Sequence, residues 1–108
     1  MKKTIDINGR KVDFKTHGAV PIFYAEKYGK DFFSTIIEME ELINGNMGGD
    51  LKPIYQLAHM FAREADSENV PEDMKEWLRT FDDGFPVIDV FVELQDLILV
   101  NMQSLKKK

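Results

Sequence analysis

The first stretch of the chain alternates apolar and polar positions. This alternation runs over residues 4–7 and again over residues 11–15, and a period of two is typical of half-buried strands. Asn8-Gly9 lies between the two runs, and this dipeptide favours a type I′ turn because both central residues of that turn need a positive φ. The pattern predicts a β-hairpin over residues 3–15, which must rest on helices because two strands alone are barely stable.

Beyond the hairpin the apolar residues recur with the period of a helix. Pro21 fits a first helical turn, Gly29 fits a left-handed C-terminus, Asp31 and Asp50 are suitable N-caps, and Pro71 is suited to open a helix. Five helices are therefore predicted, over about residues 19–28, 31–43, 51–66, 71–81 and 86–105. With 108 residues, the chain is expected to form a single α+β domain over residues 1–108, in which the hairpin packs on the helical bundle.

Individual positions in the predicted helices suggest where the core lies. Trp77 lies on the apolar face of the fourth helix, in which an apolar residue stands at every position that the helical period requires. We therefore expect Trp77 to be a core anchor. The fifth helix has an apolar face and a second apolar stripe beside it, formed by Ile88, Val92 and Leu99. Such a wide apolar arc indicates either a central helix or a helix that also contacts a partner, and burial is the commoner explanation in a small domain.

A glycine-rich segment, Asn44–Gly49, separates the second and third predicted helices. Glycine-rich loops can hold phosphates, but this one lacks both the Lys-Ser/Thr ending and a preceding strand. We therefore interpret it as a flexible connector. Met47 within it is a candidate for partner contact, because a methionine side chain adapts to surfaces of varied shape.

Charge and composition narrow the classes of function. The net charge is −5, and residues 31–105 alone carry −12, which argues against nucleic-acid binding because phosphates would be repelled. The absence of cysteine excludes disulfides and thiolate chemistry. Charged and polar residues interrupt the most apolar segment, residues 85–100, so no membrane span is predicted. The N-terminus lacks the apolar run of a signal peptide, and we expect a soluble protein.

The residues offer little for catalysis. His17 and His59 are the only histidines, their spacing matches no metal motif, and His59 is expected at the polar surface of its helix. The acidic pair Glu40-Glu41 points in different directions on a helix, and no serine lies in a nucleophile motif. We expect no enzymatic activity and no cofactor.

The order of elements, a hairpin followed by about five helices, resembles the tail assembly chaperones of long-tailed phages and prophages of Gram-positive bacteria. The resemblance is carried by the hairpin sequence Ile5-Asp-Ile-Asn-Gly-Arg-Lys-Val-Asp-Phe14, by Glu26-Lys-Tyr-Gly29 with Phe32-Phe33 after it, and by the helices through residue 105. These motifs are positions of turns and aromatic residues, without a catalytic signature.

The resemblance implies a protein without enzymatic activity that coats the helical tape measure protein while the tail tube is assembled. The tail tube protein is a second partner that it suggests, and self-association is expected because a coat needs neighbouring subunits. Such a chaperone would work in the host cell cytoplasm and be absent from the mature virion. Its families often also produce a longer, frameshifted product, and the terminal lysines 106–108 fit either a slippery codon run or simple neutralisation of a helix C-terminus.

A chaperone of a long helical client needs apolar side chains that fit many segments of that client. The candidate contact residues are Ile88, Val92, Leu99 and Met47. Two other classes of function stay open. One is another phage structural or regulatory protein, such as a head-to-tail connector component, which would remain in finished particles. The other is a small-molecule-binding or enzymatic module that uses the acidic body and His59.

Overall fold

The computed structural model describes residues 1–45 and 49–102, which form a two-stranded hairpin and six helices. The elements are β1 (Lys2–Ile7), β2 (Arg10–Lys15), α1 (Val20–Tyr28), α2 (Phe32–Asn44), α3 (Lys52–Ala65), α4 (Met74–Arg79), α5 (Val87–Glu93) and α6 (Gln95–Val100). This arrangement confirms the predicted α+β class, with an N-terminal hairpin on a helical bundle.

The hairpin forms where the alternating pattern places it. β1 and β2 pair antiparallel, with Ile5 opposite Val12 and Ile7 opposite Arg10. Asn8 and Gly9 both have a positive φ, 54° and 90°, as a type I′ turn requires. The apolar side chains of both strands are buried, and the polar ones between them face solvent.

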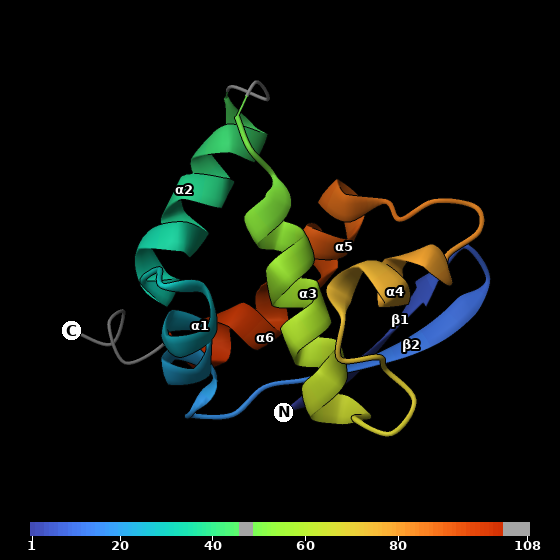
Figure 1. Cartoon of the computed structure of the whole chain (residues 1–108). Coiled ribbons are helices and arrows are strands. Elements are labelled where there is room, and N and C mark those ends of the chain that lie inside the picture. Colours follow the sequence, from blue (N-terminus) through green and yellow to red (C-terminus); the bar gives the residue numbers. More distant parts are fainter. Residues whose placement is uncertain (46–48, 103–108) are drawn as a thin grey trace.

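The helix α3 is the centre of the molecule, flanked by α1 and α2 on one side and by α4 on the other (Figure 1). It packs against β2, α2, α4 and α5, so nearly every position from Pro53 to Ala62 is buried. From the sequence, the predicted helix over residues 86–105 is the one expected to lie at the centre of the molecule, because its apolar arc is wide. The physical reason for the difference is that the hairpin and α4 cover both flanks of α3, including the side that its polar residues occupy.

The local signals at the first two helices behave as predicted, whereas Asp50 is not the N-cap of α3: that position is Leu51, which makes no side-chain cap hydrogen bond. The Asp31 carboxylate accepts a hydrogen bond from the Ser34 N–H at 2.8 Å, and the Asp50 carboxylate accepts one from Lys52 at 2.9 Å. Gly29 ends α1 with a φ of 68°. These contacts satisfy backbone groups that a helix end would leave without partners.

The fourth helix is shorter than predicted. It begins after Asp73, whose side chain accepts a hydrogen bond from the Glu76 N–H at 3.2 Å, rather than at Pro71. Pro71 instead precedes the helix, and its carbonyl accepts a hydrogen bond from His59. The aspartate two positions downstream is the better cap because it supplies an acceptor to a free N–H.

The prediction of one helix over residues 86–105 is wrong within the described part of the chain, where Leu94 separates α5 from α6. At this point side-chain nitrogens, rather than backbone N–H groups, lie within hydrogen-bond distance of carbonyls of α5. Lys3 Nζ donates to the Glu93 carbonyl at 2.6 Å, and Gln95 Nε2 lies 3.4 Å from that of Phe91. A side chain that takes a carbonyl in this way interrupts the i to i−4 ladder and bends the helix.

Candidate partner-binding surfaces

The helix α5 presents Val92, one of the predicted contact residues, to solvent. Its side chain is 57% exposed and lies on a ridge between two hollows. One hollow of about 600 Å³ separates α5 from β1, and another of about 220 Å³ separates α5 from the end of α2. Val92 therefore has the exposure that a partner contact requires.

The other predicted contact residues are less prominent. Ile88 and Leu99 are partly buried, and the break at Leu94 places them on different helices, α5 and α6. The apolar stripe that was predicted on one continuous helix is therefore interrupted between Val92 and Leu99. Met47 lies outside the described residues.

Sequence reasoning missed the most exposed apolar helix face, which belongs to α1. Ile22 is 60% exposed and Phe23 is 41% exposed, whereas Val20 and Tyr24 are fully buried. A signal for this was present in the sequence. Five of the residues in Val20–Ala25 are apolar or aromatic around the whole helix, so a helix with one face on the core must leave some of them at the surface.

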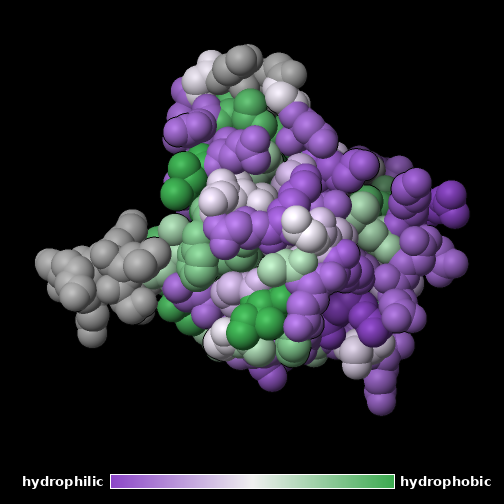
Figure 2. Space-filling model, turned by 60° about the vertical axis from the view of Figure 1, so that its left-hand side comes forward, coloured by the Kyte–Doolittle hydropathy of each residue, from purple (hydrophilic) through white to green (hydrophobic). Residues whose placement is uncertain are grey.

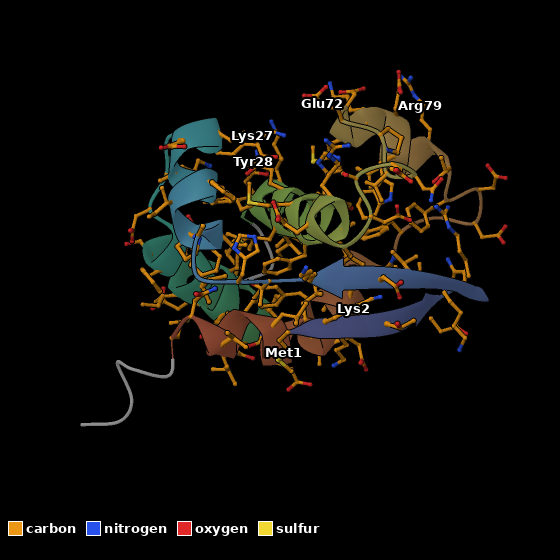
Figure 3. The ribbon with its side chains drawn as sticks, turned by 90° about the horizontal axis from the view of Figure 1, so that it is seen from below. Met1, Lys2, Lys27, Tyr28, Glu72 and Arg79 are labelled. Atoms are coloured by element: carbon orange, nitrogen blue, oxygen red, sulfur yellow. The ribbon has the colours of Figure 1, made fainter. Side chains whose placement is uncertain are left out.

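Phe23 forms one wall of a hollow of about 370 Å³ that opens above α3. Met60 of α3 and Glu72, which precedes α4, also line it. Figure 3 shows Lys27 on α1 and Glu72 before α4 on this same side of the molecule. The lining of the hollow combines two apolar side chains, Phe23 and Met60, with charged ones such as Lys27 and Glu72, and a mixture of apolar and polar groups is common at surfaces that receive a partner.

Neighbouring contacts hold this hollow in shape. His17 Nε2 lies 2.7 Å from a Glu64 carboxylate oxygen, and its Nδ1 accepts a hydrogen bond from Ala19 at 3.2 Å. The His17 ring meets the Phe23 ring edge-on, with centroids 5.8 Å apart. Arg63 Nη1 donates to two carbonyls of the segment 66–70, at 2.9 and 2.8 Å. The α1 helix and the segment after α3 are thereby fixed relative to α3.

His59 is not at the surface, contrary to the prediction. It is almost completely buried, its Nε2 donates to the Pro71 carbonyl at 2.8 Å, and its ring lies 5.5 Å from that of Trp77. Burial lowers its pKa, with the Pro71 hydrogen bond opposing that shift. Its Nδ1 has no hydrogen-bond partner among the described residues. A buried ring without access to solvent fits a structural role rather than the ligand or catalytic role that the enzymatic alternative needs.

Apolar side chains at the surface are scattered rather than continuous. Figure 2, in which the side of α1 and α2 comes forward, shows hydrophobic areas separated by hydrophilic residues. Ile37 on α2, which is 50% exposed, adds to those on α1 and α5. No described helix is long and apolar enough to cross a membrane. Over residues 1–45 and 49–102, no three acidic or histidine side chains gather into a possible metal site.

No family model, no curated protein and no solved structure matches this chain.

Proposed function

We propose that this protein is a phage tail assembly chaperone without enzymatic activity, which binds the helical tape measure protein through apolar side chains exposed on α1, α2 and α5. The observation that carries the proposal is the exposure of Ile22, Phe23 and Val92 beside hollows of the surface. The hairpin and the order of helices that suggested this family are consistent with it.

The size and separation of these apolar areas fit a weak, repeated contact. Each area offers one or two side chains, so a single subunit would hold a client helix loosely. Many subunits along one long client would bind far more strongly, because each further contact becomes intramolecular once the first has formed. A client helix carries apolar residues at i, i+3, i+4 and i+7, and such a stripe can be received by Phe23 and the hollow beside it.

The test is co-expression with the long helical tape measure protein that we expect to be encoded downstream, followed by affinity recovery and sizing of the product. We expect a soluble complex, with the client insoluble when it is expressed alone. Phe23→Asp and Val92→Asp should each reduce recovery of the client, because a carboxylate would have to be desolvated in the contact. Lys75→Asp on α4 also adds negative charge at an exposed position, but it lies outside these hollows and should leave recovery unchanged.

The outcome that contradicts the proposal is the absence of a complex when both proteins are folded and present together. The connector alternative makes a different prediction, which is tested on purified phage particles rather than on the co-expressed proteins. A connector component would be detected by mass spectrometry in finished particles, whereas a chaperone is expected to have left them.

A further inference from the structure

The strand β1 has one edge without a partner strand. Met1 and Thr16 exchange both of their backbone hydrogen bonds, at 2.9 and 3.1 Å. Hydrogen-bonded and non-hydrogen-bonded pairs alternate along an antiparallel ladder, so Lys2, Thr4 and Asp6 direct their backbone N–H and C=O groups away from β2. Within residues 1–45 and 49–102, no other group of the chain hydrogen-bonds to these backbone atoms.

A hollow separates this edge from α5, and no described backbone group across that hollow hydrogen-bonds to it. The hollow of about 600 Å³ runs beside it, lined by Thr4, Asp6 and Asn8 from the hairpin and by residues of α5. Figure 3 shows the hairpin from its outer side, with Lys2 labelled at the start of β1. An open strand edge of this kind is a template for pairing with a further strand.

The sequence of β1 is complementary to itself in one antiparallel register. When Thr4 is placed opposite Thr4 of a second copy, Lys2 of each chain stands opposite Asp6 of the other. All three residues carry outward-facing backbone groups, so each of these pairs can form two backbone hydrogen bonds. Asp6 already lies 3.5 Å from Lys11 of its own chain, and this register adds a second cation beside it.

The neighbouring registers that keep outward-facing residues opposite one another are poorer. A shift in one direction places Lys3 beside Lys3 of the second copy, and a larger shift places Lys2 beside Lys2. A shift in the other direction pairs Thr4 with Asp6, and then Asp6 with Asp6. Like charges directly opposite one another destabilise a sheet, and the register that pairs Thr4 with Asp6 has no opposite-charge pair. The register centred on Thr4 is therefore the one that the charges select.

We infer that two copies of this chain associate through β1 in the register centred on Thr4, which joins the two hairpins into a continuous four-stranded antiparallel sheet. The contact is isologous, because the same surface of each copy meets its counterpart across a two-fold axis. It lies beside the exposed Val92 of α5, which lines the same hollow. The inference depends on the edge of β1 alone and does not depend on the identity of any client.

Charge reversal tests the register. Sedimentation equilibrium of the intact chain over a range of micromolar concentrations should show a reversible dimer. Lys2→Glu places two pairs of like charges in the contact and should raise the dissociation constant by about tenfold. Combining Lys2→Glu with Asp6→Lys reverses both members of each pair and should restore the dimer. Circular dichroism of each variant verifies that the hairpin and helices are retained.

A second pair of variants tests the backbone contact separately. Thr4→Pro removes the outward N–H without touching the ladder to β2, since proline is tolerated on an edge strand when its N–H faces solvent, and it should abolish dimerisation. Thr4→Val retains the N–H but loses the hydroxyl that bonds to Asp13, and it should still dimerise. A wild-type chain that stays monomeric at several hundred micromolar, or a dimer that survives Thr4→Pro, would overturn the inference.

Discussion

Trp77 is the residue around which the aromatic core is arranged. Its ring contacts Phe81 and Phe85, with centroids 5.1 and 5.5 Å apart, and it meets Phe14 of β2 edge-on at 6.5 Å. It thereby joins α4, the loop after it and the hairpin. Its indole Nε1 is buried without a partner among the described residues, so its contribution comes from packing rather than from a hydrogen bond.

We expect Trp77→Ala to lower the free energy of unfolding by about 3–5 kcal/mol, because it removes a large buried side chain and leaves a cavity. Trp77→Phe keeps an aromatic ring and removes the unpaired N–H, so its cost should be smaller by at least about 2 kcal/mol. Urea denaturation followed by circular dichroism measures both. Equal destabilisation by the two variants would contradict a packing role.

We expect the stability of the protein to depend on pH through His59. Burial lowers its pKa in the folded protein below the ordinary value of 6.5. The unfolded chain therefore takes up a proton first as the pH falls, which favours unfolding. We expect the urea midpoint to fall as the pH decreases from 6.5 toward the lower pKa of the folded state.

His59→Gln provides the comparison for this prediction, since glutamine does not titrate and its amide can still donate toward the Pro71 carbonyl. The variant should show a smaller decrease in the urea midpoint between pH 7.5 and pH 5 than the natural protein. A decrease of the same size in both proteins would assign the pH dependence to other groups.

At the scale of elements, a residue from the opposite end of the chain contacts both sides of the break between α5 and α6. Lys3 Nζ donates to the Glu93 carbonyl at 2.6 Å and lies 3.0 Å from an Asp96 carboxylate oxygen. The hydrogen bond to Asp96 is the main reason that the pKa of Lys3 is raised. This side chain joins β1 to the start of α6.

Lys3→Met keeps most of the aliphatic side chain and removes the ammonium group. We expect the free energy of unfolding of this variant to be lower by about 1 kcal/mol, which is the usual contribution of one hydrogen bond. Amide hydrogen exchange should be faster at residues 93–97 than in the natural protein, while exchange in α3 stays unchanged. Unchanged exchange over residues 93–97 would show that the bend is intrinsic to the sequence around Leu94.

The elements that the sequence predicts well are those whose causes are local. Asn8-Gly9 determines the turn of the hairpin, and Asp31 and Gly29 determine helix ends, because each acts on backbone groups a few residues away. The break at Leu94 was missed because the lysine that occupies the Glu93 carbonyl is separated from it by 90 positions. The burial of His59 was missed for a similar reason, since Pro71 reaches it only after the chain has turned back along α3.

At the scale of the whole molecule, the candidate surface was predicted only in part. Val92, one of the candidate contact residues, is exposed although burial of its stripe was the commoner explanation, and the stripe that joined it to Leu99 assumed a straight helix. The exposed pair on α1, Ile22 and Phe23, could have been inferred because the segment Val20–Ala25 of this short helix is apolar all around. Tertiary packing decides which face of α1 is buried, and the apolar pattern of α1 by itself does not show which face that is.

Two adjacent residues of α5 allow a matched test of this surface. Phe91 is 2% exposed and Val92 is 57% exposed. Val92→Asp should change the free energy of unfolding by less than about 1 kcal/mol, because the carboxylate stays in water. Phe91→Asp should destabilise the protein by more than about 3 kcal/mol, because it buries a charge and opens a cavity.

The comparison matters for function because a loss of client binding is informative only in a folded variant. If Val92→Asp retains the urea midpoint of the natural protein and fails to recover the client, the side chain of Val92 is part of the contact surface. If Val92→Asp instead unfolds like Phe91→Asp, Val92 contributes to the core, and the exposed residues of α1 become the remaining apolar surface on which a helical client could be received.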